Sequence, residues 1–282
     1  MTEKMTRRGD YAAVWDEYVT KAFPAIRASD PVSARKQEPW RVLNRTDSRY
    51  EWPGDEWGSR SDAEQLVDET LDIDRPEYLC EIGAGAGRMT GVVLDRYPDA
   101  RIISYDVSAE FERHLRRRFE PQIDAGVLTT VLLDDRPFLI LEDLERRRLV
   151  GQIDAFYSFD AMVHVELHTQ FIYWMTAALA LKLGGRLAFN VADVTNALGF
   201  MKLAANAPGV YRGGGGVGGH FMWTSPDAVR SVLERLGFEV RFYPGNGRDL
   251  SVVAVLRERD CSAKLLRQAG ASQLTELLAR FG

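Results

Sequence analysis

The stretch Tyr78-Leu79-Cys80-Glu81-Ile82-Gly83-Ala84-Gly85-Ala86-Gly87-Arg88 is a short apolar run that breaks into three alternating glycines. A buried strand followed by a tight turn has this pattern, because glycine lets the backbone turn sharply and lets a ligand approach it closely. The N–H groups at the start of the next helix can bind that ligand. A second apolar run, Arg101–Asp106, ends in a carboxylate roughly twenty residues downstream, the spacing at which an acidic side chain accepts both hydroxyls of a ribose. The sequence therefore predicts a binding site for a nucleoside-containing cofactor.

The spacing of the glycines distinguishes two classes of cofactor. Dinucleotide binders use G-x-G-x-x-G, in which the third glycine lets helix and strand pack closely. Here Gly87 comes one residue early, and Arg88 stands where that glycine is expected. Glu81 would lie unfavourably beside a pyrophosphate, because like charges repel in a partly buried site. A carboxylate at this position suits a ligand that carries an ammonium or a sulfonium group.

The run from Glu81 to Gly87 resembles the first motif of the class I S-adenosylmethionine-dependent methyltransferases, in particular those of the small-molecule type. The resemblance implies that S-adenosyl-L-methionine is the cofactor. It also implies that the three glycines form the cofactor turn and that Asp106 holds the ribose.

Further cofactor contacts follow from the same resemblance. Asp134 falls where the family places a carboxylate against the adenine amino group, and Asp135 takes that place if the strand ends one residue later. A plain acidic turn is the alternative. The residues expected at the cofactor are Glu81, Gly83, Ala84, Gly85, Gly87, Arg88, Asp106, Val107, Asp134, Asp135, Phe159 and Trp57.

Composition narrows the class of protein. The chain has 282 residues, 45% of them hydrophobic, which is enough for one domain with extensions. Its net charge of −5 argues against a nucleic-acid partner. The polar start of the chain does not read as a secretory signal, and the longest apolar stretch, Phe171–Leu183, is too short to span a bilayer. Cys80 and Cys261 lie far apart, which fits a reducing, cytoplasmic environment.

Strand and helix patterns alternate along the body of the chain. Strands are expected to end at Ile82 and Tyr105 and to span residues 127–133, 153–159 and 186–191, with a helix over about 166–183. The last two strands, 238–243 and 250–256, are joined by so short a turn that they must be antiparallel. The expected fold is α/β: a Rossmann-like, doubly wound, mostly parallel sheet of seven strands with a terminal antiparallel β-hairpin. The methyltransferase family has this hairpin and the dinucleotide-binding fold lacks it.

Three segments flank or interrupt this body, which spans residues 61–260. Residues 1–60 form an N-terminal helical lid, in which Trp52 and Trp57 resemble the tryptophan-containing lid of many small-molecule methyltransferases; plain burial of both rings is an equal alternative. Residues 207–224 are expected to form a glycine-rich substrate lid, with a bland flexible loop as the alternative. Residues 261–282 form a helical tail that docks back or makes the interface of a homodimer.

The stretch Ser158–His164 is the candidate catalytic segment, because it lies where the family's fourth motif passes under the methionine end of the cofactor. A hydroxyl acceptor must lose a proton, and histidine is the side chain best matched to that task near neutral pH. His164 follows Asp160 by one helical turn, so the carboxylate can orient the imidazole. A structural role for His164 is the alternative, and His220 is the second candidate base.

A metal-assisted mechanism of methyl transfer is the less favoured interpretation. His164 and His168 are spaced like two metal ligands, but no H-E-x-x-H pattern accompanies them. Asp160 and Asp193 lie where some small-molecule methyltransferases bind magnesium, but Val194 replaces the second acid or amide of the Asp-Asn pair of catechol-type enzymes. No metal is therefore expected.

The predicted function is O-methylation of a small hydroxylated metabolite, such as a sugar, glycan or secondary metabolite. The [D/N]-P-P-[F/Y] turn of methyltransferases that act on base amines or glutamine is missing after the fourth strand. Two alternatives stay open: an NAD(P)-dependent Rossmann oxidoreductase, and a non-catalytic subunit that binds S-adenosylmethionine.

Overall fold

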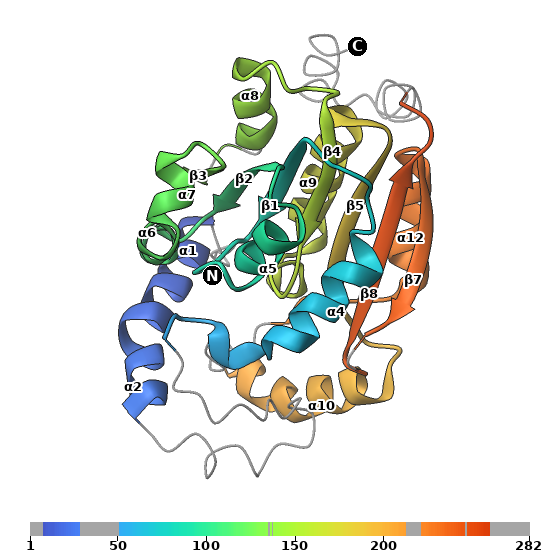
Figure 1. Cartoon of the computed structure of the whole chain (residues 1–282). Coiled ribbons are helices and arrows are strands. Elements are labelled where there is room, and N and C mark those ends of the chain that lie inside the picture. The colour runs from blue at the N-terminus through green and yellow to red at the C-terminus, as the bar shows by residue number, and fades with distance from the viewer. Residues whose placement is uncertain are drawn as a thin grey trace.

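A mixed sheet forms the centre of the molecule. The computed structural model describes residues 8–28, 51–134, 136, 138–212, 221–245 and 247–259. Seven strands follow one another across the sheet in the order β3-β2-β1-β4-β5-β8-β7 (Figure 1). They are β1 (Tyr78–Ile82), β2 (Arg101–Asp106), β3 (Leu128–Leu132), β4 (Ile153–Ser158), β5 (Leu181–Asp193), β7 (Phe238–Pro244) and β8 (Asp249–Leu256).

The predicted fold class is confirmed, with one more strand than the seven expected. β1 to β5 are parallel, and β8 is antiparallel to both β5 and β7. The additional strand, β6 (Trp223–Thr224), has only two residues and pairs with the carboxyl end of β5. So short a strand has no alternating pattern that a sequence could reveal.

Helices cover both faces of the sheet. One face packs against α8 (Leu139–Arg146), α9 (Leu167–Ala180) and α12 (Pro226–Arg235), and the other against α4 (Arg60–Thr70), α5 (Arg88–Arg96) and α6 (Ala109–Arg118). The short α7 (Glu120–Asp124) precedes β3, and α10 (Ala197–Tyr211) lies beyond the carboxyl end of β5 (Figure 1). The strand order reverses between β1 and β4, and this is where open parallel sheets bind ligands.

The N-terminal part of the chain is helical, as expected. It comprises α1 (Arg8–Glu17), a π-helical turn η1 (Tyr18–Ala22) and α2 (Phe23–Ala28). Trp15, Tyr18 and Phe23 are buried in a separate hydrophobic cluster that also holds Phe111 of α6. This cluster fixes the N-terminal helix beside the carboxyl ends of the strands.

Several element boundaries differ from the sequence expectations. Ser108 and Ser225 cap α6 and α12, and Ser59 caps α4 in a capping box with Asp62. α9 ends at Ala180, and β5 begins at Leu181. Gly184–Gly185 is therefore an irregularity inside β5, where the pairing with β4 shifts register.

The predicted glycine-rich lid is only partly described. Its first residues, 207–211, are the last turn of α10, and its last two form β6. Residues 213–220, with His220, lie outside the described part of the chain, as does the tail that follows Arg259. Among the described helices, none has the length and apolar character needed to cross a membrane.

Candidate active site

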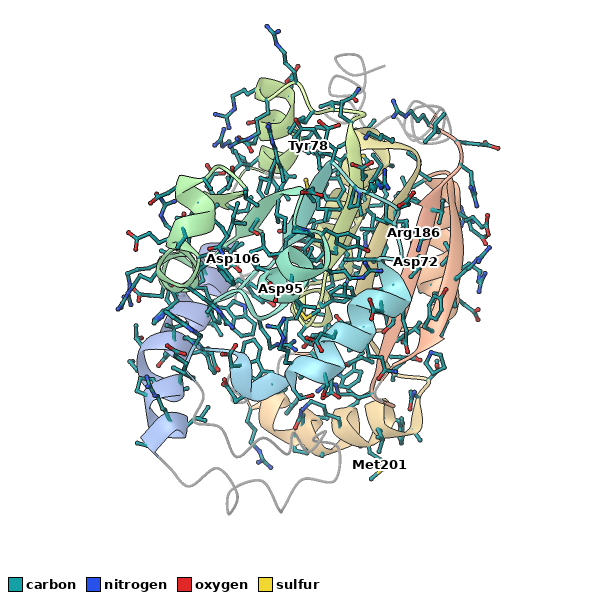
Figure 2. All side chains as sticks on the ribbon, viewed as in Figure 1. Asp72, Tyr78, Asp95, Asp106, Arg186 and Met201 are labelled. Carbon is teal, nitrogen blue, oxygen red and sulfur yellow. The ribbon has the colours of Figure 1, made fainter. Side chains whose placement is uncertain are left out.

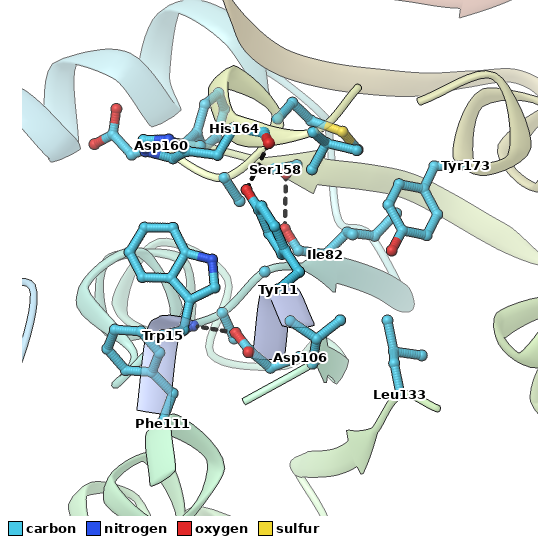
Figure 3. Close-up of a pocket in the computed structure, with 18 of the residues that line it drawn as sticks. Tyr11, Trp15, Ile82, Asp106, Phe111, Leu133, Ser158, Asp160, His164 and Tyr173 are labelled. Atoms are coloured by element: carbon cyan, nitrogen blue, oxygen red, sulfur yellow. Dashed lines mark hydrogen bonds between the residues drawn. The ribbon is translucent and has the colours of Figure 1, made fainter. Parts of the chain in front are cut away.

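A cavity of about 430 Å³ lies at the carboxyl ends of β1, β2 and β4. The glycine turn forms one side, and α1 closes the opposite side with Tyr11 and Trp15 (Figure 3). The lining is mainly apolar and rich in aromatic rings. It includes Tyr11, Trp15, Trp57, Phe111, Phe159 and Tyr173 together with Asp106, Asp160 and His164.

All three glycines of the turn have positive φ angles: 75° at Gly83, 56° at Gly85 and 85° at Gly87. A Cβ on Gly83 would lie 2.3 Å from the Cβ of Ala161, so the turn and the loop after β4 pass in close contact. A Cβ on Gly87 would lie 2.4 Å from the ring of Phe119. A Cβ on Gly85, which lines the cavity, would meet the ring of Phe111 at 3.8 Å, an ordinary van der Waals contact. The turn therefore combines tight packing at its ends with free backbone at its centre.

Asp106 ends β2 and lies in the wall of the cavity with Val107 (Figures 2 and 3). Its carboxylate accepts the backbone N–H of Gly85 at 2.7 Å and that of Ser108 at 2.8 Å. Burial raises the pKa of Asp106 to about 6, although both N–H groups act in the opposite direction. The carboxylate is thus fixed beside the glycine turn, where the ribose of a nucleoside would lie.

Glu81 does not lie at the cavity, where the sequence predicted it. Strand alternation directs its side chain to the face of the sheet that α5 covers, beneath the turn, and it does not line the cavity. It is buried, and one carboxylate oxygen accepts the hydroxyls of Thr90 at 2.6 Å and Ser104 at 2.8 Å. Burial raises the pKa of Glu81 to about 7, against the effect of these hydrogen bonds. Glu81 therefore supports the turn from below and does not face the ligand.

Asp134 also lies away from the cavity. Its exposed carboxylate pairs with Arg136 at 2.8 Å, and the neighbouring Leu133 lines the cavity in its place. Asp135 lies outside the described residues. The geometry thus favours the alternative reading of Asp134 as part of an acidic turn.

An ion pair joins the glycine turn to the loop after β4. Arg88, at the start of α5, donates to the carboxylate of Asp160, and both side chains line the cavity. Asp160 has a φ of 60°, and Asn190 of β5 holds it there by accepting its N–H at 2.7 Å and donating to its carboxylate at 3.0 Å. Burial alone would raise the pKa of Asp160, but Arg88, Arg248 and Asn190 together keep it below its ordinary value.

His164 lies in the 3₁₀ turn η3 (Met162–His164) and faces the cavity among aromatic rings. The centre of its ring is 5.1 Å from that of Trp15 and 4.7 Å from that of Phe221. Its backbone carbonyl accepts the hydroxyl of Tyr11 at 2.6 Å (Figure 3). Its proximity to Asp160 is sufficient to lower the pKa of that carboxyl. Both residues of the predicted catalytic pair therefore line the same cavity.

The contribution of α1 to the site was not foreseen. The helical spacing of its aromatic residues indicated burial, and nothing in that pattern shows that two of them face a cavity formed by strands about seventy to one hundred and fifty residues away. The predicted Trp57 does line the cavity, and its ring contacts those of Trp15 and Tyr18. Tyr18 in turn donates to the buried carboxylate of Glu56, which links the two parts of the N-terminal segment.

Two of the candidate metal ligands, His168 and Asp193, contact other side chains. His168 is fully exposed, and its ring contacts Glu166 at 3.0 Å. Asp193 is buried and accepts the N–H and hydroxyl of Thr195 at 2.8 and 2.7 Å. Within the described residues, no three His, Cys, Asp or Glu side chains are grouped as a metal ion would require.

Several solved structures with a similar fold are methyltransferases. An O-methyltransferase family protein from Burkholderia thailandensis superposes with a TM-score of 0.53 at 16% identity, over 70% of this chain and 56% of that one. A SAM dependent methyltransferase from Archaeoglobus fulgidus gives 0.52 at 12% identity, over 70% and 95%. The magnesium protoporphyrin IX methyltransferase of Synechocystis PCC 6803, solved with bound SAH, gives 0.55 at 15% identity, over 88% and 100%.

The chain spans little more than half the length of the Burkholderia protein. No protein-family model matches it, and no curated protein is similar to it in sequence. At 12–16% identity the likeness is one of fold. This chain has the fold of the class I S-adenosylmethionine-dependent methyltransferases.

Proposed function

We propose that the protein is an S-adenosylmethionine-dependent methyltransferase that methylates a hydroxyl group of a small metabolite. The observation that carries this proposal is the position of Asp106. Its carboxylate is fixed beside a glycine turn and opens into a cavity that also contains His164. A ribose-binding acid and a candidate base thus share one cavity in a methyltransferase fold.

The residues of the cavity fit this cofactor. Asp106 would accept the ribose hydroxyls, and the apolar side chains of Val107, Phe111 and Leu133 would enclose the adenine. The rings of Tyr11 and Trp15 would attract a sulfonium, because aromatic faces are electron-rich. When bound, the cofactor would supply a methyl group activated by the positive sulfur; the methyl–sulfur bond would break as the new bond forms, with neutral S-adenosylhomocysteine as the leaving group.

The protein's own part in the reaction is to position the acceptor and to remove its proton. His164 would take the proton of the acceptor hydroxyl as its oxygen attacks the methyl carbon. The nearby carboxylate of Asp160 would stabilise the resulting imidazolium, and Asn190 keeps that carboxylate in place. The apolar wall of the cavity would exclude water and hold the reacting groups in line.

Titration calorimetry separates this proposal from the oxidoreductase alternative. We expect S-adenosylmethionine to bind and NADH not to bind, and binding of NADH alone would refute the proposal. The case against a dinucleotide rests on Arg88 in place of the third glycine and on the terminal hairpin, because Glu81 does not line the cavity.

Replacement of His164 tests the mechanism and the non-catalytic alternative together. His164→Gln should lower kcat by about 100-fold or more, because general bases contribute that much, while the Kd for S-adenosylmethionine changes little. Unchanged turnover would remove His164 from the mechanism. A wild-type protein that binds the cofactor but methylates no hydroxylated metabolite would support the non-catalytic alternative.

A further inference from the structure

The outer face of α10 concentrates exposed apolar side chains. In the described part of the chain eight large hydrophobic side chains are exposed, and four of them lie on this helix: Phe200, Met201, Val210 and Tyr211. Tyr211 is 93% exposed and Phe200 60%. Figure 2 shows Met201 at the edge of the molecule, pointing away from its body. So dense an apolar surface on one exposed helix indicates an interaction site.

The charge distribution of α10 is the reverse of that of an ordinary surface helix. Its only charged residue, Lys202, is 7% exposed, and its ammonium lies 4.5 Å from the centre of the Phe221 ring. Gly199 also faces inward, because a Cβ there would lie 1.9 Å from the carbonyl oxygen of Asp193. The charged side chain is thus directed into the protein, and the outer face carries no charge.

The apolar residues of α10 are arranged symmetrically about a point between Ala205 and Asn206, midway between Phe200 and Tyr211. Phe200, Ala204, Ala207 and Tyr211 are spaced by four, three and four residues, so they form one stripe on the side opposite Lys202. Reversal of the helix about this midpoint places Phe200 on Tyr211, Met201 on Val210, and Ala204 on Ala207. Large residues meet large ones and small residues meet small ones. A two-fold axis pairs each residue i with a residue j of the second copy and j with i, and in this register the paired residues are alike in size.

We propose that α10 is a homodimer interface, in which it packs antiparallel against α10 of a second copy of the chain. The alanines would let the two helices approach closely at the centre, and Phe200 would contact Tyr211 of the other copy at each end. A membrane surface fits less well. Helices that lie on membranes carry lysine and arginine on their polar face, whereas the outer face of α10 is uncharged and the chain has a net charge of −5.

Sedimentation velocity on the full-length chain tests the surface and its register. We expect the wild type to dimerise, and Phe200→Lys and Tyr211→Glu each to weaken self-association by about tenfold or more. The double variant should recover much of the affinity, because the antiparallel register places each lysine opposite a glutamate. Leu183→Glu is the matched control, since Leu183 is equally exposed, at 62%, but lies in β5. It should behave as the wild type, and circular dichroism should confirm that all variants are folded.

Several results would overturn this proposal. A wild type that is monomeric at all concentrations, or single variants that dimerise as the wild type does, would exclude the interface. Weakened single variants without recovery in the double variant would exclude the antiparallel register. Dimerisation lost on truncation after Arg259 but kept in both single variants would assign the contact to the tail. A monomer that sediments with phosphatidylcholine vesicles would assign α10 to membrane binding.

Discussion

At the residue scale, the three glycines of the turn serve different purposes. Gly87 lets α5 pack against Phe119, whereas Gly85 has space around it and only its φ of 56° disfavours a side chain. Gly87→Ala should therefore lower the free energy of unfolding by about 2–4 kcal/mol, and Gly85→Ala by about 1–2 kcal/mol. Urea denaturation measures both values. Equal losses would show that packing against Phe119 does not distinguish the two positions.

A second prediction at the residue scale concerns Glu81 and the pH dependence of the free energy of unfolding. Its pKa is raised from 4.5 to about 7, so between these values the folded protein holds a proton that the unfolded chain has released. The free energy of unfolding should therefore fall as the pH rises through this window, by up to about 1.4 kcal/mol per pH unit. Glu81→Gln keeps an oxygen for Thr90 and Ser104 and removes the titration.

Denaturation of this variant and the wild type, at about pH 5 and about pH 8, measures the effect. The variant should lose less stability than the wild type between the two conditions. The same loss in both proteins would show that Glu81 does not titrate in this window.

The residues that could be predicted are those whose role depends on local spacing. The glycine turn and Asp106 are close in sequence to the strands that present them, so their meeting followed from the pattern. Glu81 was assigned to the ligand by its distance from the glycines, although strand alternation places it on the side of Leu79, under α5. Tyr11 and Trp15 could not be assigned to the site, because their position depends on packing between distant segments.

At the element scale, the N-terminal helix α1 contributes side chains to the cavity wall. It supplies Trp15 to the cavity wall, and Asp16 accepts the hydroxyl of Ser108 at 2.5 Å, next to Asp106. Trp15→Ala should weaken binding of S-adenosylhomocysteine by about tenfold or more, because one wall of the cavity is lost. Lys21→Ala, in an exposed ion pair two turns further on, is the control and should bind normally. Unchanged binding in Trp15→Ala would show that α1 only covers the site.

Elements with long, regular patterns were the predictable ones. The strands β1 to β5 are largely apolar runs between glycine or polar breaks, and all five were predicted. β5 begins five residues earlier than Arg186, because Gly184–Gly185 has the composition of a turn although it lies inside the strand. β6 is defined only by its pairing with β5, and two residues are too few to show the alternating pattern of a strand.

At the scale of the whole molecule, the order of the strands accounts for the position of the site. The reversal between β1 and β4 opens a gap at the carboxyl edge of the sheet, and the glycine turn and Asp106 lie there. The antiparallel β7–β8 hairpin at the other end separates this sheet from the dinucleotide-binding fold. The short link between these two strands made that topology predictable from the sequence.

The central claim is that Asp106 and the glycine turn hold the adenosyl part of S-adenosylmethionine. A crystal structure of the complex with S-adenosylhomocysteine tests it most directly. We expect the ribose hydroxyls within about 2.6–3.2 Å of the Asp106 carboxylate, with the sulfur directed to the side of the cavity that His164 lines. A ribose bound elsewhere, or a cavity that stays empty at saturating ligand, would contradict it.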